Sequence, residues 1–135
     1  MPRKLYIATS EPRSGKSLVM LGVMELLSRR VDRLGFFRPI IRDHDELDND
    51  IELVRARYAL SHPYDSMYGA TIEDARRTTA DRSADALLKQ VLRKYRAMES
   101  ECDFVLCEGT DFLVSRRHSS LISMRRLRTT WAAPY

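Results

Sequence analysis

Hydrophobic and polar residues follow one another along the chain in patterns that predict strands and helices in turn. Short runs rich in β-branched and aromatic residues are typical of strands and occur at residues 4–9, within 31–41, and at 103–108. Stretches with apolar residues three and four positions apart are typical of helices and cover residues 15–30, 51–60, 71–79 and 80–99. The order strand, helix, strand makes a right-handed crossover between parallel strands the expected connection. The predicted fold class is α/β, a P-loop NTPase-like parallel sheet with flanking helices that is incomplete, with about three strands.

The same patterns predict which faces are buried. Residues 4–9 are apolar on both faces, which favours a central strand between two helix layers. Pro39 should end the second strand or push it to an edge, because proline cannot donate to a ladder. In the first helix, the stripe expected to face the core consists of Leu18, Val19, Gly22, Val23, Leu26 and Leu27.

Capping residues predict where two of the helices begin. Residues 71–74 have the spacing of a capping box, with Thr71 as N-cap and Asp74 in place of the usual glutamate. The helix at 51–60 has Asn49 or Asp50 near its cap. On the longest helix, the apolar face consists of Ala84, Leu87, Leu88, Val91, Leu92 and Tyr95.

Length and composition limit the class of protein. A chain of 135 residues holds at most one domain, and a complete α/β domain of this type normally needs more chain. The sequence is 44% hydrophobic and 31% charged, with no secretory signal and no apolar run long enough to cross a membrane, so no membrane partner is predicted. Cys102 and Cys107 fall on opposite faces of one strand and should be free, which favours a cytoplasmic location.

The net charge of +4 is concentrated in the C-terminal tail. Residues 114–135 contain five arginines and no acidic residue, whereas residues 1–113 contain 18 basic and 19 acidic residues. Only the tail is therefore a candidate for binding nucleic acid.

The segment at residues 10–17, Ser-Glu-Pro-Arg-Ser-Gly-Lys-Ser, lies between the first strand and the first helix. This layout is typical of a P-loop, in which N–H groups at a helix start and a lysine hold phosphate oxygens. Ser10 stands where the first glycine of the pattern is expected. The alternative is an ordinary helix start with Ser14 as the N-cap.

Glu108 follows a short apolar strand and is the second candidate feature. Such a strand resembles a Walker B strand, whose carboxylate orients Mg²⁺ directly or through water. Ligands gather at the carboxyl ends of parallel strands, so Glu108 and the loop after Thr9 are expected at one crevice. An ordinary strand that ends in a surface glutamate is the alternative, and the nearby Gly-Lys-Ser turn favours the metal site.

Four stretches together resemble the N-terminal domain of bacterial phosphate acetyltransferase, which is similar to dethiobiotin synthetase and the cobyrinate synthases. They are residues 5–17, 35–40, 68–75 and above all 102–112, which include Glu-Gly-Thr-Asp-Phe. The resemblance covers about residues 4–113. It implies a P-loop domain that regulates and helps assemble a long, homo-oligomeric enzyme. Acetyl transfer between coenzyme A and phosphate would be carried by a separate, missing C-terminal domain.

The resemblance also implies roles for individual residues. The residues implied to contact a nucleotide are Ser14, Gly15, Lys16, Ser17 and Arg38, and those implied to hold the metal are Ser17, Asp50 and Glu108. Asp45 and Asp48 compete with Asp50 for its role. Arg38 falls where dethiobiotin synthetase has a substrate-contacting lysine, and a permanent cation there disfavours a carboxylation reaction.

The predicted function is a regulatory domain with no catalytic residue of its own. It would bind ATP or another nucleotide with Mg²⁺, or a small regulatory effector, at a site that Ser10, Pro12 and Arg13 suggest is vestigial. One alternative is an ATP-dependent enzyme of the dethiobiotin synthetase or cobyrinate synthase type. The other is a nucleic-acid-binding module that uses the arginine-rich tail.

The resemblance ends near Leu113, and residues 114–135 are interpreted as out-of-frame translation. Codons can be chosen for residues 121–131 that give family-like residues when read one base earlier. A disordered end and a basic binding arm are the alternatives. A gene in which no one-base shift restores a reading frame would contradict the interpretation. With few strands and exposed sheet edges, the isolated chain is predicted to be marginally stable or prone to aggregate.

Overall fold

Four parallel strands form one sheet in the computed structural model, which describes residues 3–8, 15–42, 45–80 and 84–109. In spatial order the strands are β1 (Arg3–Ile7), β4 (Phe104–Glu108), β2 (Leu34–Ile41) and β3 (Tyr68–Thr71). Every pair of neighbours is parallel, as expected when helices connect successive strands. The predicted α/β class is confirmed.

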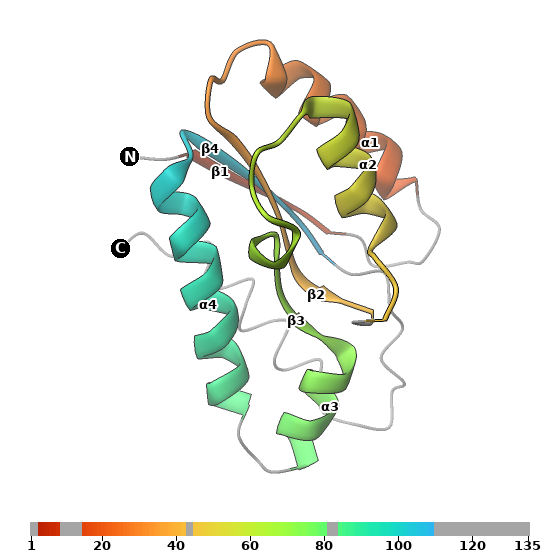
Figure 1. Ribbon diagram of the computed structural model, residues 1–135, viewed down its shortest axis with the longest axis vertical. Helices are drawn as coiled ribbons and strands as arrows, with labels where there is room; N and C mark the ends of the chain where they lie inside the picture. The colour runs from red at the N-terminus through yellow and green to blue at the C-terminus, as the bar shows by residue number, and fades with distance from the viewer. Residues whose placement is uncertain (1–2, 9–14, 43–44, 81–83, 110–135) are drawn as a thin grey trace.

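Helices cover both faces of this sheet (Figure 1). The first helices are α1 (Lys16–Ser28) and α2 (Asn49–Tyr58), which contact each other, and α2 packs on β2. On the other face α4 (Ala84–Glu101) packs against β2, β3 and β4. The short 3₁₀ helix η1 (Tyr64–Ser66) precedes β3, and α3 (Ile72–Ala80) joins β3 to α4. The layers therefore form a three-layer α/β arrangement.

The core lies on both sides of β2, whose eight residues are all buried. Phe36 and Phe37 point to opposite faces of the sheet, and the ring of Phe37 meets Tyr95 of α4 edge-on at 5.5 Å. Other fully buried side chains from the surrounding elements are Met20, Met24, Ile51, Val54, Val91 and Leu106. This packing fixes β2 and β4, the strands on which the candidate site depends.

The central position predicted for the first strand is wrong. In the described sheet β1 pairs only with β4 and lies at one end, and Leu5 is 41% exposed. β4, the last described strand in the sequence, lies between β1 and β2. An apolar run shows that a strand can be buried, but strand order depends on crossovers that the run does not encode.

The structure also contains a strand that the sequence did not suggest. β3 has only four residues, and only Met67 separates it from η1. Gly69 allows it to lie close to its neighbours, because a Cβ at this position would be 2.5 Å from the carbonyl oxygen of Pro39. The sheet thus has four described strands rather than about three.

The buried face predicted for the first helix is largely wrong. Met20 and Met24 are fully buried, whereas Leu18, Val19 and Leu26 are 76%, 56% and 61% exposed. Of the predicted stripe, Val23 and Leu27 pack partly against the core. Because α1 is apolar nearly all round, its periodicity fits two faces equally well.

Pro39 neither ends β2 nor lies in an edge strand, contrary to prediction. β2 continues to Ile41 between β4 and β3. The N–H of Arg38 donates to Met67 on the β3 side, so the nitrogen of Pro39 faces the β4 side. The pairing of β2 with β4 ends at Phe37, one residue earlier in β2 than Arg38. The lack of an N–H group at Pro39 therefore removes no hydrogen bond between these two strands.

The predicted capping box is confirmed. Asp74 N–H donates to Thr71 Oγ1 at 3.1 Å, and Thr71 N–H donates to Asp74 Oδ2 at 3.0 Å. The N-cap of α2, however, is Asp48 rather than Asn49 or Asp50, since Asp48 accepts from the N–H groups of Asp50 and Ile51.

The remaining sequence predictions concern the cysteines, membrane-spanning segments and residues that the structure does not describe. Both cysteines are free and buried, as predicted, but Cys102 precedes β4 and so does not share a strand with Cys107. Within the described part of the chain, no helix is long and apolar enough to span a membrane. Ser10, Ser14 and residues 114–135 lie outside the described residues, and so does the boundary predicted near residue 113.

Candidate functional site at the carboxyl end of the sheet

The start of α1 lies against the carboxyl ends of β1 and β4. Gly15 precedes α1 in the left-handed conformation, with φ 78°, and its carbonyl accepts from Leu18 and Val19. Among the described residues, no side chain caps this helix start. Gly109 N–H donates to Ile7 O at 2.8 Å, which ties the end of β4 to the end of β1. A helix start with a left-handed glycine and no side-chain cap can offer N–H groups to an anion.

Lys16 is the first residue of α1, and its side chain is buried against the end of β4. Its Nζ donates to the carbonyl oxygen of Gly109 and lies 3.6 Å from Glu108 Oε1. The side chain is 1% exposed, which is unusual for a lysine and indicates that specific partners hold it. The predicted convergence of Lys16 and Glu108 is thus present in the geometry.

Glu108 ends β4 and is completely buried. Neither carboxyl oxygen has a hydrogen bond to another described residue. Burial raises the pKa of Glu108 to about 7, the Arg38 and Lys16 cations act to lower it, and Asp50 and Asp48 raise it further. A buried carboxyl group with unused oxygens is the main unexplained polar group of this region.

Arg38, on β2, connects Glu108 with two aspartates near the start of α2. Its Nη1 lies 2.6 Å from Asp48 Oδ2 and 3.3 Å from Asp50 Oδ2, and its Nε lies 3.8 Å from Glu108 Oε2. Burial lowers the pKa of Arg38, but the charges of Asp48, Glu108 and Asp50, with the Asp48 hydrogen bond, outweigh burial and raise it. The guanidinium is therefore a permanent buried cation.

Asp48 has two roles that the sequence did not reveal. Its Oδ1 caps α2, while its Oδ2 accepts from Arg38. Its own N–H donates to the hydroxyl of Tyr64 at 2.8 Å. The only available signal was an aspartate directly before a helix, a pattern that fits Asp48, Asn49 and Asp50 alike.

A sequence model of the AAA domain family matches residues 3–134. The chain belongs to the AAA domain family. It is 44% identical over 115 residues to a phosphate acetyltransferase from Nitratidesulfovibrio vulgaris and 40% identical over 115 residues to one from Synechocystis sp.. A phosphate acetyltransferase from Pseudomonas aeruginosa is 28% identical over 115 residues. The resemblance to phosphate acetyltransferase is confirmed, and the chain spans 16% of the length of each of these relatives.

In this AAA domain, four of the predicted site residues come together: Lys16, Arg38, Asp50 and Glu108. Gly15 and Ser17 adjoin Lys16, with Ser17 half-buried in the first turn of α1. Asp45 is exposed. The sequence reasoning found most members of the cluster, and their roles toward a ligand stay predictions.

Carboxylate oxygens are the side-chain atoms of this cluster that could bind Mg²⁺. Among the described residues, no group of three or more His, Cys, Asp or Glu side chains is arranged to hold a metal ion. Magnesium in nucleotide sites commonly uses one or two carboxylates together with substrate phosphates and water. The unbonded oxygens of Glu108 and the nearby carboxylate of Asp50 fit that smaller requirement.

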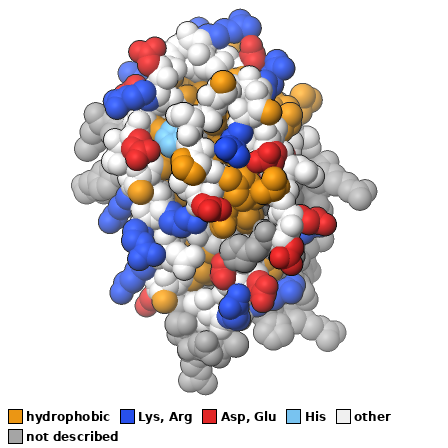
Figure 2. Space-filling model, viewed as in Figure 1, with side chains coloured by type: hydrophobic (Ala, Val, Ile, Leu, Met, Phe, Trp, Pro, Cys, Tyr) orange, Lys and Arg blue, Asp and Glu red, His pale blue; other side chains and the backbone are white. Residues whose placement is uncertain are grey.

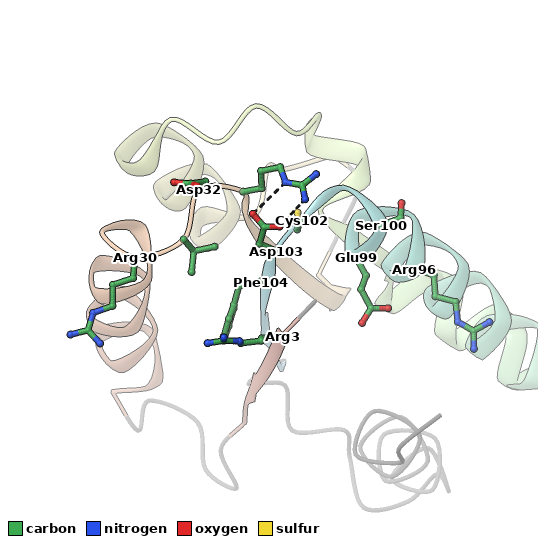
Figure 3. Close-up of a pocket in the computed structure, with 11 residues that line it drawn as sticks. Arg3, Arg30, Asp32, Arg96, Glu99, Ser100, Cys102, Asp103 and Phe104 are labelled. Carbon is green, nitrogen blue, oxygen red and sulfur yellow. Dashed lines mark hydrogen bonds and ion pairs between the residues drawn. The ribbon is translucent and has the colours of Figure 1, made fainter. Parts of the chain in front are cut away.

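A separate open hollow of about 800 Å³ lies around the amino ends of β1 and β4 (Figure 3). Its wall includes Arg3, Arg30 and Arg96, and a hydrogen-bonded ion pair joins Arg33 to Asp103. None of the described side-chain atoms around it is buried without a hydrogen-bond partner. Unlike the Glu108 region, this hollow therefore presents no unexplained buried polar group.

Proposed function

We propose that this AAA domain holds the phosphate groups of a nucleotide at the carboxyl end of its sheet and acts as a regulatory domain. The observation that supports this most is the buried Lys16 at the start of α1, 3.6 Å from the unbonded carboxyl group of Glu108. A lysine at a helix start beside a carboxylate at a strand end is the arrangement that P-loop domains use for nucleotide phosphates and Mg²⁺.

Each residue has a specific part in this proposal. Ser14, Gly15 and Ser17 would offer N–H groups or hydroxyls to the phosphates, and Lys16 would exchange the Gly109 carbonyl for a phosphate oxygen. Where Mg²⁺ accompanies the nucleotide, Glu108, Asp50 and Ser17 are the residues that would hold it. These residues would bind and orient the nucleotide, and no residue of the chain is proposed to transfer an acetyl group.

The proposed regulatory role is based on the similarity of this chain to a short segment of much longer enzymes. The relatives are named phosphate acetyltransferase, and the chain matches a segment of 16% of their length. We propose that acetyl transfer belongs to other parts of such enzymes, and that nucleotide bound here changes the assembly or activity of an oligomeric enzyme. An effector other than ATP that carries phosphate would use the same lysine.

Calorimetric titration of ATP into the purified 135-residue chain, with and without Mg²⁺, tests the nucleotide site. Lys16→Ala should weaken binding at least tenfold, because it removes the buried cation of the site. Lys89→Ala, which changes an exposed lysine of α4, should leave the affinity unchanged. Absence of ATP binding by the unmodified chain, or equal binding by the Lys16 variant, would contradict the proposal.

A ligase of the dethiobiotin synthetase type is less well supported by the geometry. Carboxylation chemistry would suit a lysine whose amine can become neutral, whereas Arg38 is a permanent cation paired with Asp48. Nucleotide turnover measured as ADP release should therefore be absent. Steady ADP release lost with Lys16→Ala would favour the ligase.

The arginine-rich tail is the part of the sequence that we consider for nucleic-acid binding. On the face shown in Figure 2, Lys and Arg side chains are interspersed with Asp and Glu, which gives no broad basic surface on the described residues there. Salt-sensitive DNA binding that disappears when residues 114–135 are removed would support a binding arm. The out-of-frame origin of these residues stays a prediction that the gene sequence tests.

A further inference from the structure

Five charged side chains meet at the carboxyl end of the sheet. They extend from four different helices and strands, so the cluster is a fixed part of the fold. Lys16 comes from α1, Arg38 from β2 and Glu108 from β4, while Asp48 and Asp50 come from the start of α2. With all groups ionised, three carboxylates face two cations. Arg38 contacts all three carboxylates at 2.6 to 3.8 Å, so it is the main counter-charge of the cluster.

Arg38 is held in place rather than free to swing away. It is 5% exposed, and it extends from the fully buried strand β2. Its shortest partner, Asp48, is itself fixed as the N-cap of α2 and by its N–H bond to Tyr64. A guanidinium keeps its charge at every ordinary pH, so this cation cannot be removed by deprotonation.

A divalent metal at Asp50 and Glu108 would have to share their oxygens with Arg38. Magnesium and manganese bind oxygen at short range, about 2.0–2.2 Å. Arg38 nitrogens lie 3.3 Å from Asp50 Oδ2 and 3.8 Å from Glu108 Oε2, so such a metal would lie within about 6 Å of the guanidinium. In a buried site two cations this close repel each other much more than they do in water.

We propose that Arg38 is a resident counter-cation that competes with divalent metal for Asp50 and Glu108 and so makes metal binding to this site weak. The proposal rests on the nucleotide site proposed above and specifies its regulation. Anionic ligands would be held mainly by Lys16 and the helix start, and their binding would depend little on Mg²⁺.

The test uses Mn²⁺ alone, added to the full 135-residue chain without nucleotide, with free Mn²⁺ followed by electron paramagnetic resonance. The unmodified chain should bind Mn²⁺ with a millimolar or weaker Kd. The neutral variants Arg38→Met and Arg38→Gln should bind at least tenfold more tightly. Arg38→Lys keeps a cation, although not the guanidinium fork, and should bind Mn²⁺ more weakly than the two neutral variants.

Two controls assign the effect to this cluster. Arg55→Met removes another arginine paired with a carboxylate, Glu52 on the surface of α2, and should leave Mn²⁺ binding within twofold of the unmodified value. Adding Glu108→Gln to Arg38→Met should abolish the gained affinity. Circular dichroism spectra show which variants are folded.

Two results would overturn the proposal. One is equal or weaker Mn²⁺ binding by a folded neutral Arg38 variant. The other is micromolar binding by the unmodified chain that is lost in Glu108→Gln, a result that does not depend on whether the Arg38 variants fold. Because no nucleotide is present, a failure here is distinct from a failure of Lys16-dependent ATP binding.

Discussion

Glu108 shows how burial controls the charge of a single residue. The carboxyl group has no hydrogen-bond partner among the described residues, and two cations lie 3.6 and 3.8 Å away. Burial dominates, and the pKa of Glu108 is raised to about 7. The carboxyl group of Glu108 therefore changes charge near neutral pH, the pH range in which a nucleotide or a metal would bind.

The free energy of unfolding should depend on pH through Glu108. Between about pH 4.5 and pH 7 the native state keeps a proton that the unfolded state has lost, so stability falls as pH rises through this window and levels off above it. The full effect is of the order of 3 kcal/mol for this buried group. Urea unfolding at pH 5, 6, 7 and 8 measures the slope.

Glu108→Gln should remove this fall, because an amide does not titrate. Glu73→Gln changes an exposed carboxyl group on α3 and is the matched control, for which the slope of the unmodified chain should remain. An unchanged slope in Glu108→Gln would mean that Glu108 is not the titrating group.

At the scale of elements, the capping box at the start of α3 connects a sequence pattern to a measurable stability. Thr71→Ala should lower the free energy of unfolding by about 1 kcal/mol, because Asp74 N–H loses its acceptor. Thr71→Ser keeps the hydroxyl and should cost less. Chemical denaturation of the two variants provides the comparison, and equal losses would assign the effect to packing of the buried Thr71 methyl group instead.

Local sequence patterns predicted the helices and strands. The capping box, the apolar strand before Glu108 and the Gly-Lys turn each depend on a few neighbouring residues, and all three are present in the part of the chain that the structure describes. The order of the strands and the buried face of α1 depend on contacts between residues distant in sequence. The same holds for the pairing of Arg38 with Asp48, because no fixed spacing marks such an ion pair.

At the scale of the whole molecule, exposed apolar surface should control solubility. Leu18, Val19 and Leu26 form an exposed apolar strip on α1, and Leu5 of the end strand β1 is also exposed. Apolar patches of this kind favour association. We therefore expect the isolated chain to self-associate, as light scattering at increasing concentration would show.

The double variant Leu18→Lys/Leu26→Lys should reduce this self-association without lowering the thermal unfolding temperature. Met24→Lys, on the buried side of the same helix, should destabilise the protein strongly because it buries an unpaired charge. A soluble monomer that unfolds cooperatively without any substitution would contradict the expected self-association.

The strand order has a consequence for the time course of folding. β4 is the last described strand to leave the ribosome, yet it lies between β1 and β2, with Leu106 opposite both Leu5 and Phe36. The sheet can be completed only after residue 108 has been synthesised. The residues that pair between β1 and β4 are about a hundred positions apart in the sequence, and contacts between residues so distant in sequence slow folding. Until then β1 and one edge of β2 expose unpaired backbone, and unpaired strand edges of this kind are prone to aggregate. Pulse-labelled hydrogen exchange during refolding should show β1 amides protected only together with those of β4.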